Sequence, residues 1–96
     1  MSTYYFTESL YRLNDLNRAN EMIKRTADYV NKELTHLADV SESKNQLAAE
    51  QDVRFYLAYL GQMVKLTEAF KQDGLSKNLE KQYNNHIIRF TPFATG

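Results

Sequence analysis

The sequence has 96 residues, of which 12 are basic and 12 acidic, so its formal net charge is zero. This length fits one small domain over residues 1–96, and the balanced charge excludes a strong overall attraction to nucleic acid or to an anionic membrane. The chain has no cysteine, which excludes disulfides and thiolate chemistry and suits a reducing cytoplasm. No leader peptide is apparent, and no apolar run approaches the roughly 18 residues that span a bilayer. We therefore expect a cytoplasmic protein that does not act at a membrane.

The first predicted helix covers about residues 7–39. Thr7 is a good N-cap and Glu8 suits the first turn, while Phe6 and Tyr11 have the spacing of a hydrophobic staple. Apolar residues then recur at alternating intervals of three and four, as in a helix that packs lengthwise against another helix. This dimer or helix-packing seam comprises Leu13, Leu16, Asn20, Ile23, Ala27, Val30, Leu34 and Leu37.

Two features of this helix leave alternatives open. Asn20 is the polar member of the seam: it either pairs with a second buried asparagine that fixes register and oligomeric state, or lies at a solvated gap. A basic row of Arg18, Arg25 and Lys32 faces outward, with an acidic residue three or four positions before each. We interpret this row as a solvated, self-paired face rather than a nucleic-acid stripe.

The second predicted helix covers about residues 44–72. Residues 40–45 are polar and the seam lapses there, while Ser43 and Gln46 have capping-box spacing. We favour a turn, which makes a long helical hairpin, over a continuous rod. The helix has two adjacent apolar rows and therefore requires two partners. The rows are Val53, Leu57, Leu60, Val64 and Thr67, and Tyr56, Tyr59, Met63, Leu66 and Phe70.

A helix stop and a short third helix follow. Gly74 is expected to take the left-handed conformation that ends a helix, and Ser76 then caps a helix of about residues 77–89. Thr91 precedes proline and avoids helical angles, so residues 91–96 are expected to form a tail.

Charge is divided unevenly between the two halves of the chain. Residues 1–53 hold six basic and nine acidic side chains, a net charge of −3, and residues 54–96 hold six basic and three acidic, a net charge of +3. We expect the halves to dock on each other or on a second copy. Lysines and an arginine make the C-terminal third locally basic, which supports a DNA-binding alternative. They are Lys71, Lys77, Lys81 and Arg89.

No pattern of catalytic, cofactor-binding or metal-ligating residues stands out. The two histidines, His36 and His86, lie in neither an HxxxH nor an ExxH arrangement, and the three glycines are isolated, which excludes a glycine-rich phosphate loop. We therefore expect no catalytic residue, no cofactor and no metal, and interpret the protein as a non-enzyme.

Aromatic residues are the strongest indication of a contact function. The chain has seven tyrosines and five phenylalanines, and tyrosine is enriched at contact surfaces because a large apolar ring carries a polar tip. We expect about half of these aromatic residues to fill the core between the helices and the others to lie at a contact surface. The candidate partner contacts are Tyr4, Tyr5, Tyr56, Tyr59, Phe90 and Phe93.

The start of the chain resembles a known family over about ten residues. The run Met1 to Tyr5, followed by Glu8 and Leu10, is similar to the start of the phage Gam family. That resemblance implies a small helical dimer whose long first helix blocks a host DNA-repair nuclease. The similarity does not extend beyond these residues, and the chain lacks that family's acidity. The resemblance therefore illustrates one class of function, that of a small helical protein that inhibits a larger one.

These observations predict an all-α fold: a long helical hairpin plus a short third helix, with coiled-coil-like packing, paired into a homodimer. The expected function is that of a non-enzymatic protein-binding module. It would be a small inhibitor or chaperone-like adaptor, of the kind a phage or mobile element carries, that acts by direct contact with a larger protein. The alternative is a dimeric DNA-binding transcriptional regulator.

Overall fold

The computed structural model describes residues 3–93, which form four α-helices and no β-strand. The all-α prediction is therefore confirmed. The helices are α1 (Thr3–Arg12), α2 (Leu16–Lys44), α3 (Glu50–Ala69) and α4 (Asp73–Phe90), and a short 3-10 helix, η1 (Thr91–Phe93), follows them. Part of the expected C-terminal tail is thus helical, and its last three residues, 94–96, lie outside the described residues.

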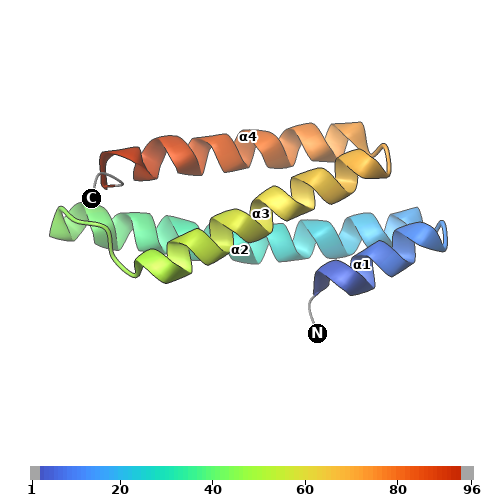
Figure 1. Ribbon diagram of the computed structural model, residues 1–96, viewed down its shortest axis with the longest axis horizontal. Coiled ribbons are helices and arrows are strands. Elements are labelled where there is room, and N and C mark those ends of the chain that lie inside the picture. The colour runs from blue at the N-terminus through green and yellow to red at the C-terminus, as the bar shows by residue number, and fades with distance from the viewer. Residues whose placement is uncertain (1–2, 94–96) are drawn as a thin grey trace.

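The helices form an elongated bundle of 46 × 25 × 19 Å arranged along α2. Figure 1 shows that α3 runs in the opposite direction to α2 and crosses over it, and that α4 returns in the direction of α2. α1 is antiparallel to α2 and lies beside its N-terminal part. Every helix is therefore placed against a helix that precedes or follows it in the chain.

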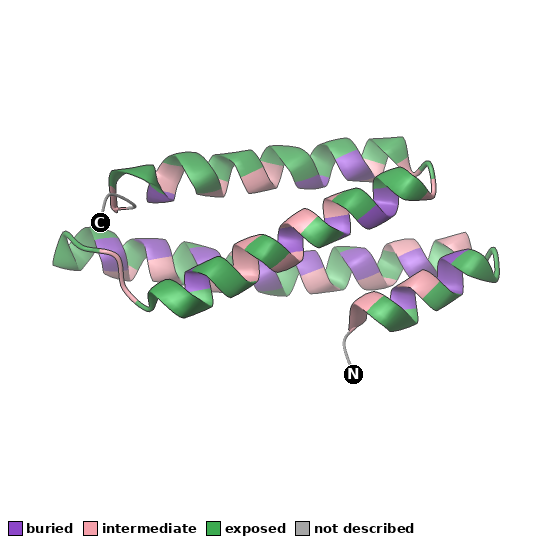
Figure 2. Cartoon of the chain, in the orientation of Figure 1, coloured by how far each residue is buried: buried purple, intermediate pink, exposed green. Residues whose placement is uncertain are grey.

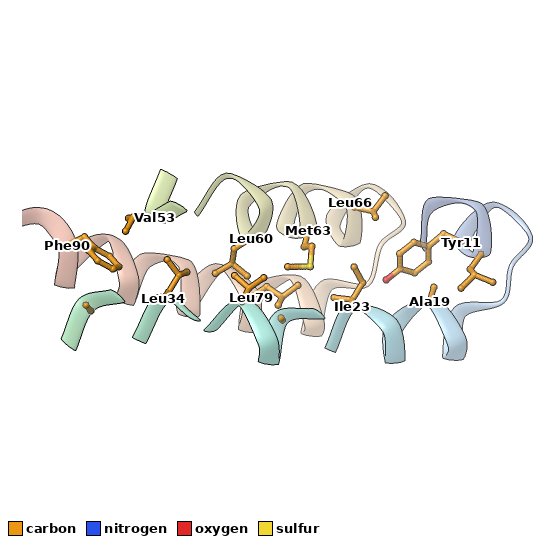
Figure 3. Close-up of a cluster of buried hydrophobic side chains, with 14 residues drawn as sticks. Tyr11, Ala19, Ile23, Leu34, Val53, Leu60, Met63, Leu66, Leu79 and Phe90 are labelled. Atoms are coloured by element: carbon orange, nitrogen blue, oxygen red, sulfur yellow. The ribbon is translucent and has the colours of Figure 1, made fainter. Parts of the chain in front are cut away.

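The core contains side chains from all four helices, and Figures 2 and 3 show it as a continuous band along the bundle. Figure 2 shows buried positions of α2, α3 and α4 facing one another and exposed positions outward. In Figure 3, Leu60 of α3 and Leu79 of α4 lie together near the middle of this band, and Leu34 of α2 follows toward the Phe90 end; each is at most 1% exposed. The helical periodicity of the sequence thus places its apolar residues on the inner faces.

The expected continuous helix over residues 7–39 is wrong because the chain breaks at residues 13–15. α1 ends at Arg12, and Asn14 takes a left-handed conformation with φ of 63°. The amide of Asp15 donates to the Leu10 carbonyl at 2.9 Å and closes the turn. Asparagine tolerates this conformation better than most residues do. The break folds α1 back, so that Leu10 and Tyr11 are buried instead of lying on a solvated rod.

The expected start of this helix is also wrong. α1 begins at Thr3, so Thr7 lies inside it as a buried residue rather than an N-cap. The Thr7 hydroxyl donates to the Thr3 carbonyl at 2.7 Å, within the helix. Phe6 also lies within α1 rather than before its cap and is 42% exposed, so the expected hydrophobic staple with Tyr11 does not form.

The turn between α2 and α3 covers residues 45–49, and α3 starts at Glu50 rather than near residue 44. Two left-handed residues, Asn45 and Ala49, bound it. Buried Ser41 holds it from within: its hydroxyl donates to the Leu37 carbonyl at 2.8 Å and accepts the Ala48 amide at 2.9 Å. Ser41, which lies in the polar segment where the seam lapses, therefore stabilises the turn.

The end of α3 also differs from the expectation. α3 ends at Ala69, and the left-handed residue is Lys71, with φ of 61°, rather than Gly74. Its neighbour, the Gln72 amide, donates to the Thr67 carbonyl at 2.8 Å and closes the helix end. α4 then begins at Asp73, four residues before the predicted start, and Gly74 lies in its first turn. The left-handed position that follows α3 is therefore occupied by a lysine rather than by a glycine.

Gly74→Ala is expected to raise the free energy of unfolding by about 0.5–1 kcal/mol, because alanine restricts the unfolded chain and favours helix. A Cβ at this position would meet no atom within 4 Å. Thermal denaturation measures the change. Lys71→Val serves as the comparison and should be destabilising, because a β-branched residue disfavours positive φ. A destabilised Gly74→Ala variant would contradict this position of the helix end.

Candidate protein-contact surface

Most of the predicted seam is internal to one chain. Ile23, Ala27, Val30 and Leu34 are each at most 3% exposed and belong to the core. Leu16 and Leu37 are half-buried and pack against it. These side chains are therefore not available to a second copy while the chain keeps this fold. Leu13 does not belong to the seam, since it lies at the helix break and is 78% exposed.

Asn20 connects three segments of a single chain, which neither of the two interpretations had foreseen. The buried Tyr11 hydroxyl of α1 donates to Asn20 Oδ1 at 2.6 Å, and Asn20 Nδ2 donates to Gln72 Oε1 at 2.9 Å. Burial raises the pKa of Tyr11 to about 12. The Tyr11 ring stacks on Phe70, with centroids 5.0 Å apart. Asn20 thus fixes the position of α1 and of the α3–α4 turn against α2.

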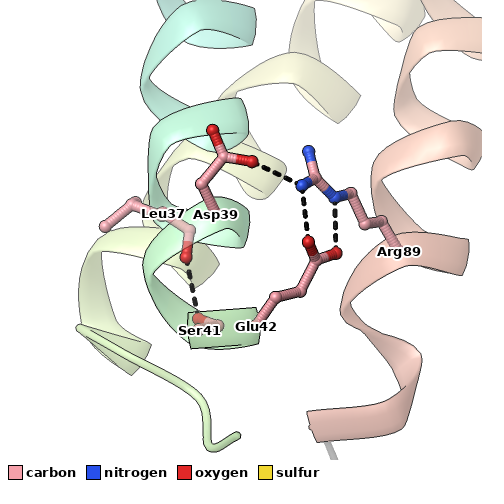
Figure 4. A network of polar contacts seen from close by, with 5 residues as sticks. All are labelled: Leu37, Asp39, Ser41, Glu42 and Arg89. Atoms are coloured by element: carbon pink, nitrogen blue, oxygen red, sulfur yellow. Dashed lines mark hydrogen bonds and ion pairs between the residues drawn. The ribbon is translucent and has the colours of Figure 1, made fainter. Parts of the chain in front are cut away.

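An arginine joins the C-terminal ends of α2 and α4. Figure 4 shows the Arg89 guanidinium between Asp39 and Glu42: Nη2 donates to Asp39 at 2.6 Å, and Nε and Nη2 donate to the two Glu42 oxygens at 2.8 and 2.9 Å. These hydrogen bonds lower the pKa of Glu42 and raise that of Arg89. The pairing links the acidic first half of the chain with the basic second half, as the charge division suggested.

A neutral polar contact lies beside this ion pair. The His86 Nε2–H donates to Asn31 Oδ1 at 2.7 Å, and Asn31 Nδ2 donates to Gln82 Oε1 at 2.6 Å. Burial, and then the charge of Arg89, lower the pKa of His86. The folded protein therefore favours the neutral imidazole.

Stability is expected to fall as the pH is lowered from 8 toward 5, because the unfolded chain protonates His86 near its ordinary pKa of about 6.5 while the folded chain resists it. The contribution is present above this value and is lost as the pH falls through the lowered native pKa. Urea denaturation at several pH values measures it, and the slope should flatten in His86→Gln. An unchanged slope in that variant would contradict this role of His86.

The six predicted aromatic contacts lie in different surroundings. Phe90 is 4% exposed and belongs to the core, so its assignment to a contact surface is wrong. Only Tyr5 is largely exposed. The remaining four are half-buried: Tyr4, Tyr56, Tyr59 and Phe93.

The structure instead gathers four aromatic rings on one exposed surface of α2 and α3. We call this the aromatic cluster: Tyr29, Phe55, Tyr56 and Tyr59. Tyr56 makes edge-to-face contacts with Tyr29 at 6.2 Å and with Phe55 at 5.5 Å, and Phe55 meets Tyr59 at 6.1 Å. Tyr29 and Phe55 are 57% and 60% exposed. The sequence analysis missed both residues because it selected contacts from the seam of the first helix and the two apolar rows of the second, and Tyr29 and Phe55 lie outside these sets.

Charge also distinguishes this surface. Interaction with the Tyr29 hydroxyl, followed by desolvation and the charges of Tyr29, Glu33 and Asp52, raises the pKa of Tyr56 to about 12. The Tyr56 hydroxyl is thus neutral at neutral pH, and the charges of two carboxylates reach it.

The basic row on α2 is largely paired. Arg18 lies 3.5 Å from Asp15 and Arg25 lies 3.3 Å from Glu21. In the C-terminal third, Arg89 is bound by two carboxylates, whereas Lys71, Lys77 and Lys81 are exposed. The basic surface is therefore smaller than the sequence suggested.

Within residues 3–93, no helix combines the length and apolar character needed to cross a bilayer. The same residues contain no group of three or more histidine, aspartate or glutamate side chains that could hold a metal ion. His36 is exposed and His86 is held by Asn31. Comparisons with protein families, with curated proteins and with solved structures found no match.

Proposed function

We propose that this protein is a non-enzymatic protein-binding module, an inhibitor or chaperone-like adaptor that acts by direct contact with a larger protein. The observation that supports the proposal is the aromatic cluster. Contiguous apolar patches on the surface of a soluble domain usually mark a site of interaction with another molecule. Rings of this kind often dominate binding energy at the centre of an interface.

The proposal includes a helical hairpin of α2 and α3 with coiled-coil-like packing, because the buried residues Ile23, Ala27, Val30 and Leu34 are spaced by four, three and four. It also includes a homodimer in the cytoplasm. The buried seam leaves only exposed apolar side chains outside the aromatic cluster for a dimer contact, such as Phe6 and Ile87. Multi-angle light scattering at micromolar concentration tests the dimer, and a monomer at every concentration contradicts it.

The experiment is partner capture from a host lysate with identification of the bound protein, followed by titration of that protein against variants. Tyr29→Ala with Phe55→Ala should weaken binding by about 2 kcal/mol or more, roughly 30-fold. Both side chains are mostly exposed, so the variant should remain folded, which circular dichroism verifies.

The matched control replaces two exposed apolar residues elsewhere, Leu13→Ala with Ile88→Ala, and should retain binding. A second control, Arg18→Gln with Arg25→Gln and Lys32→Gln, should also retain it. Equal loss in the aromatic variant and the first control would contradict a localised surface. Loss confined to the neutralised basic row, together with a steep salt dependence of DNA binding, would favour the DNA-binding regulator.

A further inference from the structure

The aromatic cluster is flanked by two carboxylates from different helices. Glu33 lies one turn after Tyr29 on α2, and Asp52 lies one turn before Tyr56 on α3. Residues four apart on a helix are neighbours on its surface, so each carboxylate lies beside a ring of the cluster. Among residues 3–93, neither carboxylate has an ion-pair partner.

Most basic side chains near the cluster are already paired; the exception is Lys32, which lies three residues after Tyr29 on α2, is exposed and makes no ion pair within residues 3–93. Arg25, one turn before Tyr29, lies 3.3 Å from Glu21, and Arg54, next to Phe55, lies 3.3 Å from Glu50. The exposed neighbours of Phe55 on its side of α3 are uncharged or acidic. They are Gln51, Asp52, Ala58 and Gln62. Apart from Lys32, the surface therefore offers the unpaired charges of two carboxylates and no free positive charge at these positions.

This combination suits a cation with an apolar stem. Ring faces carry negative potential that attracts a guanidinium or ammonium group within about 6 Å of the centroid. A carboxylate beside the ring adds a charge-assisted hydrogen bond, and the methylene stem of the cation covers the ring. Arginine fits best, because its planar group both stacks and binds carboxylate in a bidentate manner.

We infer that the aromatic cluster, with Glu33 and Asp52, receives an arginine- or lysine-bearing segment of the partner protein. This inference rests on the proposed function and names the chemistry of its partner. A phosphate-bearing partner would be repelled by the two carboxylates. Contact between the clusters of two copies related by a two-fold axis would bring the same carboxylates together, which is unfavourable.

Isothermal titration calorimetry with two synthetic probes tests the inference. One probe is a short helical peptide with arginines along one face and leucines beside them, and the other carries glutamates in place of the arginines. The wild-type protein should bind the arginine peptide and not the glutamate peptide. Glu33→Gln with Asp52→Asn, which keeps all four rings, should weaken that binding by about tenfold or more.

The matched control is Glu68→Gln with Glu80→Gln, which removes the same charge from exposed positions of α3 and α4 and should change the affinity by less than about twofold. No binding of the arginine peptide, equal binding of the glutamate peptide, or equal loss in this control would overturn the inference. A wild-type dimer that the Glu33→Gln, Asp52→Asn variant strengthens would also overturn it, since the occupant would then be a second copy.

The captured partner separates this inference from the proposed function. If Tyr29→Ala with Phe55→Ala loses the partner while Glu33→Gln with Asp52→Asn keeps it, the binding module stands and the cationic segment is wrong. If the aromatic variant keeps the partner, the aromatic cluster is not the contact surface, and both the observation that supports the proposed function and this inference fail. Loss of the partner in both variants, with retention in the control, supports both.

Discussion

Leu60→Ala is expected to lower the free energy of unfolding by about 2–5 kcal/mol, because it leaves a cavity where α2, α3 and α4 meet. Leu60 is 0% exposed and lies together with Leu79 near the middle of the core. Urea denaturation with detection by circular dichroism measures the loss. A domain of this size has only about 5–15 kcal/mol of stability, so this one substitution removes a large part of it.

The same substitution at Leu13 provides the control. Leu13→Ala should change the free energy of unfolding by less than about 0.5 kcal/mol, because the side chain lies in solvent at the helix break. The seven-residue pattern alone would rank Leu13 as a seam residue with a large cost. A loss at Leu13 similar to that at Leu60 would show that α1 and α2 are continuous in solution.

Tyr11→Ala is expected to cost about 3–5 kcal/mol, the usual range for truncating a buried aromatic ring. The ring stacks on Phe70 and its hydroxyl bonds Asn20, so it is the main attachment of α1. Urea denaturation measures the loss, and limited proteolysis should show earlier cleavage in residues 3–12.

Tyr11→Phe separates the ring from the hydroxyl. It keeps the stack on Phe70 and removes one hydrogen bond, so its expected cost is about 1 kcal/mol. Proteolysis of α1 should remain close to that of the wild type. If the two substitutions were equally costly, the attachment of α1 would depend on the Asn20 contact rather than on packing.

The sequence predicted the parts of the fold that depend on helical periodicity. Ile23, Val30, Leu34 and Leu60 were placed on inner faces because apolar residues repeat at three- and four-residue intervals there, and they are buried. The break at Asn14 could not be predicted in this way. It depends on the gain from folding α1 back onto α2, and no glycine or proline signals it.

The candidate surface was only half visible in the sequence. Tyr56 and Tyr59 were named as contacts. Phe55 contacts both of them within α3, whereas Tyr29 joins the cluster only because α2 and α3 meet at that point. Phe90 was misplaced because a position near the C-terminus looked exposed, whereas α4 continues to that residue and buries it. Contacts between helices are set by docking geometry, which a single helical pattern does not contain.

The ion pair between Arg89 and the end of α2 has a consequence for folding kinetics. Arg89 is 50 residues from Asp39 and 47 from Glu42 along the chain. It can reach them only when α3 and α4 have both folded back, so we expect the pair to form late, after the main barrier. Interactions that form late slow unfolding and leave the folding rate almost unchanged. Salt, which screens exposed charges, should therefore shorten the lifetime of the native state more than it delays its formation.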